Sequence, residues 1–126
     1  MKKIIQIVED DPDLRFILQY ILDDSGLELE MFDCIYAFSH RKHDADLFIL
    51  DVRLPDGSGI ELSQMLKSSA STSAIPVMIM SAHARAESAL KQGRADYFID
   101  KPFNLEDFVS KVKKLIFRGI KTINNI

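Results

Sequence analysis

The sequence has a single cysteine, no excess of basic residues and no apolar stretch near the roughly 20 residues that cross a bilayer. Cys34 alone excludes an internal disulfide. With 16 Lys and Arg against 19 Asp and Glu, the net charge of −3 gives no electrostatic reason to expect binding to nucleic acid or to a membrane surface. Five uncharged residues between Lys3 and Glu9 are too few for the core of a signal peptide. We therefore expect a cytoplasmic protein.

The 126 residues, 47% of them hydrophobic and 28% charged, suit one globular domain with a hydrophobic core. No internal repeat and no domain boundary is visible. We expect one domain over residues 1–117 and a tail over residues 118–126, RGIKTINNI, which either extends the last helix or begins a linker.

Strand-length apolar runs alternate with helical patterns along the chain. Three runs are nearly continuous in apolar residues, at 4–8, 47–50 and 77–80, and two further strands fit at about 28–32 and 96–99. Such runs are typical of strands buried on both faces of a sheet. The alternation predicts an α/β fold with a doubly wound parallel sheet and helices on both faces.

The first and last helices carry the clearest signals. Asp11 is a suitable N-cap and Pro12 suits the first turn, and the inward face up to Gly26 comprises Leu14, Ile17, Leu18, Ile21 and Leu22. Asn104 is a suitable cap for the last helix, whose apolar stripe comprises Leu105, Phe108, Val109, Val112, Leu115 and Ile116.

The remaining helical segments are less distinct. Residues 59–68 predict a helix with Ile60, Leu62, Met65 and Leu66 facing inward, and residues 85–92 predict one that is rich in alanine. Residues 33–46 predict a short or irregular helix. They include His40 and His43, which we interpret as surface residues because no Cys or acid stands at metal-ligand spacing.

Polar residues follow the carboxyl ends of the predicted strands. Glu9 and Asp10 end the first, Asp51 the third and Ser81 the fourth, and Lys101 follows the fifth. In an open parallel sheet these ends share one edge, where ligands bind. The five side chains are therefore expected to converge.

Three carboxylates at such an edge repel one another unless a cation joins them, and Mg²⁺ prefers carboxylate and carbonyl oxygens with several waters. Lys101 and Ser81 suit a second anion, for which phosphate is the obvious candidate. The pattern predicts a carboxylate that accepts a phosphoryl group, with Mg²⁺ and Lys101 neutralising the charge on the transferring oxygens.

Four motifs in chain order carry a resemblance to a known family. V-E-D-D at 8–11 with Arg15 following, D-x-x-L-P-D-G-S-G from Asp51, M-S-A at 80–82 and K-P-F at 101–103 resemble the receiver domain of two-component response regulators. The similarity spans about residues 3–117. It implies a flavodoxin-like, five-stranded parallel sheet with strand order 2-1-3-4-5.

The resemblance also implies roles for the acidic residues. Asp51 would receive a phosphoryl group from a phosphohistidine on a sensor histidine kinase or phosphotransfer protein. Asp10 would bind Mg²⁺ directly, Glu9 through water and Arg53 through its backbone carbonyl. The domain would catalyse only its own phosphorylation and dephosphorylation, so we expect no enzyme in the usual sense.

Further implied roles concern the switch. Ser81 and Lys101 would bond the phosphoryl oxygens, and Phe98 would turn inward as Ser81 moves, although a plain core aromatic explains Phe98 as well. An X-Pro bond adopts cis at a cost of only about 0.5–1 kcal/mol. The resemblance favours a cis Lys101–Pro102 bond over a trans proline that opens the last helix. Arg94 departs from the family pattern, which usually has Gly there.

The resemblance implies partners as well. The face formed by helix 85–92, strand 96–99 and the last helix would contact a downstream effector or output domain, and it also allows a homodimer. Direct contact with nucleic acid or membrane is not expected.

Two alternative functions belong to other classes. A Mg²⁺-dependent phosphohydrolase can also form an aspartyl phosphate, but similar enzymes have an Asp two residues on, where this chain has Arg53. A degenerate receiver would bind partners without phosphorylation, which the complete set of five site residues argues against.

Overall fold

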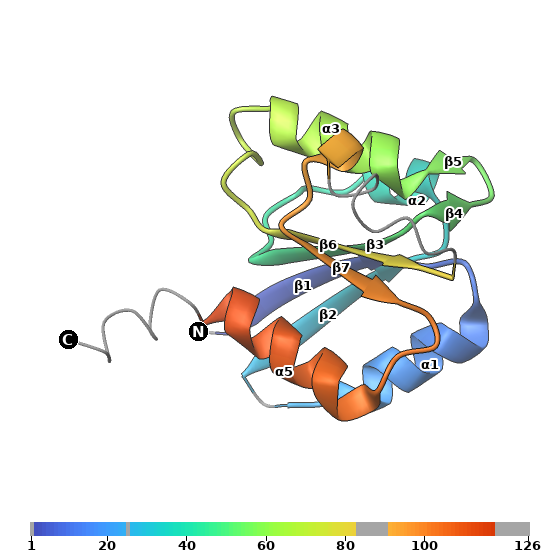
Figure 1. Cartoon of the computed structure of the whole chain (residues 1–126). Helices are drawn as coiled ribbons and strands as arrows, with labels where there is room; N and C mark the ends of the chain where they lie inside the picture. Colours follow the sequence, from blue (N-terminus) through green and yellow to red (C-terminus); the bar gives the residue numbers. More distant parts are fainter. Residues whose placement is uncertain (1, 25, 83–90, 118–126) are drawn as a thin grey trace.

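A central parallel sheet organises the computed structural model, which describes residues 2–24, 26–82 and 91–117 (Figure 1). Its five strands lie in the order β2-β1-β3-β6-β7. Their bounds are Lys3–Val8 for β1, Leu27–Phe32 for β2, Leu47–Asp51 for β3, Val77–Ser81 for β6 and Tyr97–Asp100 for β7. Every neighbouring pair is parallel. The predicted α/β class and the strand order 2-1-3-4-5, counted along the chain, are confirmed.

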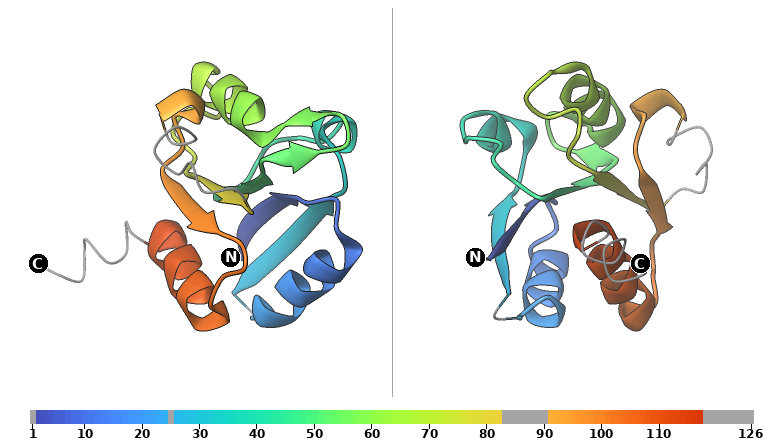
Figure 2. Two further views of the ribbon diagram at one scale, coloured as in Figure 1. Left: turned by 45° about the vertical axis from the view of Figure 1, so that its right-hand side comes forward. Right: turned by 90° about the vertical axis from the view of Figure 1, so that its left-hand side faces the viewer.

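Helices cover both faces of the sheet (Figures 1 and 2). On one face lie α1 (Pro12–Ile21) and α5 (Leu105–Ile116). On the other lie α2 (Ile35–Ser39) and α3 (Gly59–Ser68). Each layer closes its own apolar core, one centred on Ile7, Ile49 and Phe108 and the other on Phe38, Phe48 and Leu50.

The predicted helix caps are present. The Asp11 carboxylate accepts from the amides of Asp13 at 2.9 Å and Leu14 at 3.4 Å, and the Asn104 side chain accepts from the Asp107 amide at 3.0 Å. These contacts satisfy amides that would otherwise lack a partner at the helix start. The second helix is short, as predicted. The first ends at Ile21, before the expected stop at Gly26.

A small antiparallel ribbon separates the third strand from the next helix. It consists of β4 (Arg53–Leu54) and β5 (Gly57–Ser58), in a stretch for which the sequence predicts no strand. The Asp56 carboxylate, at the tip of the ribbon, accepts from the amides of Ile35 and Tyr36, each at 2.8 Å. These two bonds hold the pKa of Asp56 below its usual value. The ribbon is therefore tied to the start of α2.

Three apolar residues predicted to face inward are exposed instead. Met65 on α3 is 64% exposed, because the buried face of this helix follows Gly59, Leu62 and Leu66 and Met65 lies about 100° round the helix from its centre. Ile17 on α1 and Leu105 on α5 are 40% and 45% exposed. Ile17 and Leu105 lie on the inward side of their helices but outside the hydrophobic core.

The predicted alanine-rich helix of residues 85–92 falls outside the described residues from 85 to 90, which include Ala86, Ala89 and Leu90. Residues 91–93 are helical. Arg94 has a φ of 55°, in the left-handed region that favours glycine, and its guanidinium donates to the Gln64 carbonyl at 3.3 Å and to the Ser68 hydroxyl. None of the described helices is long and apolar enough to span a membrane.

Gly59 packs against the end of β3 more closely than any side chain allows. A Cβ atom there would lie 2.0 Å from the Asp51 carbonyl oxygen and 2.8 Å from its carbon. We expect Gly59→Ala to lower the free energy of unfolding by about 3 kcal/mol or more, since neither backbone segment has room to shift. Urea unfolding would measure this. The control is Gly26→Ala, whose Cβ has an ordinary 3.4 Å contact, and equal losses in both variants would contradict the prediction.

Candidate phosphoacceptor site

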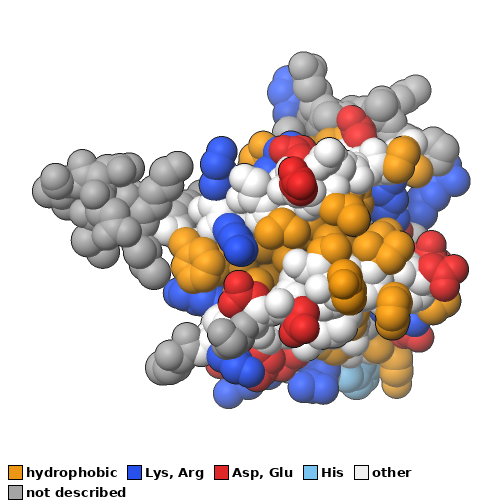
Figure 3. Space-filling model, turned by 90° about the horizontal axis from the view of Figure 1, so that it is seen from below, with side chains coloured by type: hydrophobic (Ala, Val, Ile, Leu, Met, Phe, Trp, Pro, Cys, Tyr) orange, Lys and Arg blue, Asp and Glu red, His pale blue; other side chains and the backbone are white. Residues whose placement is uncertain are grey.

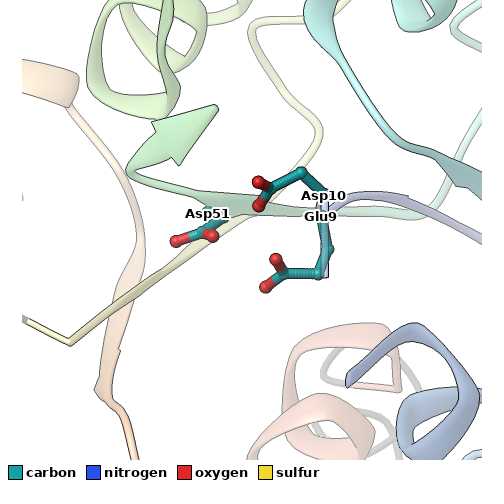
Figure 4. A group of neighbouring side chains, drawn as sticks. All are labelled: Glu9, Asp10 and Asp51. Atoms are coloured by element: carbon teal, nitrogen blue, oxygen red, sulfur yellow. The ribbon is translucent and has the colours of Figure 1, made fainter. Parts of the chain in front are cut away.

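The site lies at the carboxyl edge of the sheet, where β1 and β3 end side by side. Val8 pairs with Leu50 across these strands, so the next residues, Glu9 and Asp51, come close together. Figure 4 shows the carboxylates of Glu9, Asp10 and Asp51 pointing toward one another. Each offers an oxygen within 4.8 Å of the others, so all three can reach one ion. Glu9 and Asp51 are buried, whereas Asp10 is exposed.

Lys101 joins this cluster from the end of β7, the outer strand of the sheet. Its ammonium donates to Glu9 Oε1 at 2.7 Å and to Asp51 Oδ2 at 3.1 Å. Lys101 directly follows β7, and its amide donates to the Ser81 carbonyl at 2.7 Å, which places it beside the end of β6. The Lys101–Pro102 peptide bond is cis, as expected. One cation is thus held between two carboxylates that follow different strands.

Glu9 is the most strongly held of the three acids. It is fully buried, and Glu9 Oε2 accepts from the Asp11 amide at 3.1 Å. Burial raises the pKa of its carboxyl group to about 7, although the bonds from Lys101 and the Asp11 amide act in the opposite direction. For Lys101, burial lowers the pKa, but the bonds to Glu9 and Asp51 outweigh it and leave that pKa above its ordinary value.

Two contacts at the site were not anticipated from the sequence. The sequence assigned Glu9 to a metal and Lys101 to a phosphoryl group, whereas the structure bonds them directly to each other. Arg15, noted only as part of a motif, donates from Nη1 to the Glu9 carbonyl at 2.8 Å and so fixes the backbone between the paired acids. The position of Arg15, one turn into α1, was the feature of the sequence that could have indicated this contact.

The remaining predicted residues surround the cluster. Ser81 ends β6 and is 4% exposed. Phe98 is half-buried in β7 and packs against the core on the α2 and α3 side. Arg53 is the first residue of the β4–β5 ribbon, directly after Val52, and it is exposed. Pro102 lines a cleft of about 400 Å³ that lies beside Lys101 and continues over α1 to Ile17 and Leu105.

His40 and His43 lie elsewhere, after the end of α2. His40 is exposed, with Nδ1 at 2.8 Å from the Tyr36 carbonyl. His43 is half-buried rather than on the surface, because its ring stacks on Phe38 at 4.2 Å, and burial lowers the pKa of its imidazole. Among residues 2–24, 26–82 and 91–117, only Glu9, Asp10 and Asp51 form a group that could share a metal ion.

Comparison with known proteins decides the family. The family model of the response regulator receiver domain matches residues 5–113 of this chain. The chain belongs to the receiver domain family. It is 31% identical over 122 residues to the phosphate regulon transcriptional regulatory protein PhoB of Klebsiella pneumoniae, covering 94% of this chain and 53% of PhoB. It thus spans about half the length of this relative.

Two further matches cover almost the whole length of this chain and of the matching protein. The polar-differentiation response regulator DivK of Brucella ovis is 30% identical over 125 residues, with 92% of this chain and 98% of DivK covered. The solved structure of the BeF₃-activated DrrB receiver domain superposes with a TM-score of 0.81 at 28% identity, covering 92% of this chain and 98% of that one. These relatives are regulators, and this receiver domain shares their fold over nearly its whole length.

Proposed function

We propose that this receiver domain takes a phosphoryl group onto Asp51 from a phosphohistidine of a sensor histidine kinase or phosphotransfer protein. The observation that carries the proposal is the bond from Lys101 to Asp51 within a cluster of three carboxylates. An Asp51 oxygen forms the new bond to phosphorus while the bond from phosphorus to the donor nitrogen breaks. The electron pair of that bond leaves with the imidazole, and the Lys101 ammonium offsets charge on the transferring oxygens.

The acidic cluster fits a hard divalent cation. Asp10 and Asp51 offer carboxylate oxygens that Mg²⁺ prefers for direct contact, Glu9 would act through a water molecule, and the backbone carbonyl of Arg53 is a further proposed ligand. Mg²⁺, when bound, would neutralise part of the charge on the phosphoryl oxygens. Asp10 is exposed, which leaves room on the solvent side for waters.

The switch proposed for this domain uses residues of β6 and β7. Ser81 would bond a phosphoryl oxygen, since it ends the strand beside β3, and Phe98 would turn inward from its half-buried position. The cis Lys101–Pro102 bond lies in the loop between β7 and α5 and belongs to the same segment. Partners of the switched state would be a downstream effector or an output domain, with the cytoplasm as the expected compartment.

The phosphoryl donor has an obvious place to dock. The cleft beside Lys101 is lined by Leu14 and Ile17 of α1, by Phe103 in the loop before α5 and by Leu105, the first residue of α5. A protein that brings a phosphohistidine to Asp51 would come close to this cleft, because Lys101 lines the cleft and bonds to Asp51. We therefore propose that donors contact the start of α1 and the loop before α5.

Incubation with acetyl phosphate tests the proposal. With Mg²⁺, intact-mass measurement is expected to show one phosphoryl group per chain, and with EDTA it is expected to show none, since three carboxylates beside a single ammonium would repel an incoming phosphoryl group. No incorporation in Mg²⁺ would point to a degenerate receiver. Sustained turnover of p-nitrophenyl phosphate would instead indicate a phosphohydrolase.

A further inference from the structure

The Asp56 carboxylate joins the β4–β5 ribbon to a helix that precedes it by some 20 residues in the chain. It accepts from the amides of Ile35 and Tyr36, the first two residues of α2, each at 2.8 Å. A Cβ atom on Gly57, the next residue of the ribbon, would lie 2.8 Å from Ile35 Cδ1, so the two elements also pack closely. Figures 1 and 2 show the ribbon beside α2. Two hydrogen bonds and a packing contact therefore connect the ribbon to α2.

Each of these two elements is too small to keep its shape alone. The ribbon pairs Arg53 with Ser58 and Leu54 with Gly57, and an isolated two-stranded ribbon is marginally stable at best. The helix α2 has five residues, and helices shorter than about 12 residues are marginal without tertiary contacts. Asp56 supplies acceptors for amides that have no partner within the first turn of α2. Loss of the Asp56 carboxylate should therefore loosen the ribbon.

The ribbon begins next to the acidic cluster. Asp51 ends β3. The Val52 amide donates to the Met80 carbonyl at 3.1 Å, and the Val52 carbonyl accepts from the Gly59 amide at 2.9 Å. Arg53, whose backbone carbonyl is the proposed ligand, is the first residue beyond these bonds, so the position of that carbonyl depends on the ribbon. Because Mg²⁺ needs near-ideal octahedral geometry with ligands at about 2.0–2.1 Å, a small shift of one ligand lowers the affinity.

We propose that Asp56 is a positioning residue for the Mg²⁺ site, where it holds the Arg53 carbonyl in place by connecting the ribbon to α2. The inference rests on the proposed function, because it requires that the acidic cluster binds Mg²⁺. Asp56 lies outside the group of carboxylates that could share an ion, so it acts on the metal through the ribbon. Leu54 of the ribbon packs in the core on the α2 and α3 side. Figure 3 shows the opposite side, where α1 and α5 carry exposed apolar side chains beside the proposed donor contact. Substitution of Asp56 therefore leaves that contact unchanged.

Calorimetric titration of the 126-residue chain with magnesium chloride tests the proposal. We expect Asp56→Ala to raise the Mg²⁺ dissociation constant about 10-fold, as loss of a group that orients a metal ligand does. Asp56→Asn keeps one acceptor oxygen and should cause a smaller increase. At saturating Mg²⁺, both variants should accept a phosphoryl group from acetyl phosphate at the wild-type rate, because the acids and Lys101 are unchanged. A general loss of structure would instead lower that rate at every Mg²⁺ concentration.

Two control variants separate this connection from other effects. Cys34→Ala removes the acceptor of the Ala37 amide, Cys34 Sγ at 3.4 Å, from the same helix start and leaves the bonds of Asp56 in place. Asp33→Asn removes one negative charge two residues before Ile35. Each control should keep the Mg²⁺ dissociation constant within a factor of two of wild type.

The outcomes distinguish this inference from the proposed function. A wild-type chain that does not bind Mg²⁺ would overturn the proposed metal site and the role of Asp56 with it. Mg²⁺ binding by the wild type with an unchanged dissociation constant in Asp56→Ala would overturn the role of Asp56 alone, and so would an equal increase in either control. Thermal unfolding verifies that each variant is folded at the temperature of the titration. If Asp56→Ala does not fold, Asp56→Asn decides, and an affinity equal to wild type there would overturn the role.

Discussion

Asp51→Asn is expected to abolish incorporation of the phosphoryl group and to leave the domain folded. An amide is a far weaker nucleophile than a carboxylate, and Asp51 is the acid at the end of β3 that accepts from Lys101. Asn has the shape of Asp, and Lys101 keeps its 2.7 Å bond to Glu9, so the strand edge should persist. Intact mass after acetyl phosphate treatment measures the effect, and circular dichroism verifies the fold.

Asp33→Asn is the control for that variant. Asp33 also follows a strand of the sheet and is exposed, but it lies outside the acidic cluster. It should be phosphorylated at the wild-type rate. Wild-type incorporation in Asp51→Asn would remove Asp51 from its proposed role.

Lys101→Met is expected to slow phosphorylation about 100-fold, which is the usual cost of removing one donor that stabilises charge in a transition state. Methionine keeps the apolar stem but cannot donate to Asp51 or to the phosphoryl oxygens. The variant should also be less stable, because Glu9 is fully buried and loses its cationic partner. Rates are therefore compared below the melting temperature of the variant, with quench-flow or mass detection.

The matched control for this change is Lys111→Met. Lys111 pairs with Asp107 on the exposed side of α5 and does not contact the acidic cluster. Its loss should leave the phosphorylation rate within a factor of two of wild type. A Lys101→Met rate that close to wild type would contradict the role given to the Lys101 ammonium.

The sheet and the convergence of the site could be predicted because both depend on local patterns. Strands buried on both faces need nearly continuous apolar runs, as in β3 and β6, where every residue is buried. Once the strands are parallel, their carboxyl ends must share one edge. Glu9, Asp51 and Lys101 therefore meet although up to 92 residues separate them in the chain.

Other features depend on contacts that no local pattern contains. Helical periodicity identified Ile17, Met65 and Leu105 as apolar positions, but whether another element covers them is set by the spacing of the helices over the sheet. The bond between Lys101 and Glu9 likewise follows from three carboxylates that meet beside a single ammonium. No pattern in the residues around Arg94 predicts that its side chain bonds to Ser68 on α3.

Chemical trapping of the phosphorylated residue tests the central claim most directly. Borohydride reduces an aspartyl phosphate to homoserine, and peptide sequencing then identifies the residue that carried the phosphoryl group. After treatment with acetyl phosphate and Mg²⁺, we expect homoserine at position 51 and unmodified acids at positions 9 and 10. Homoserine at position 10, or a phosphoryl group that resists borohydride, would contradict it.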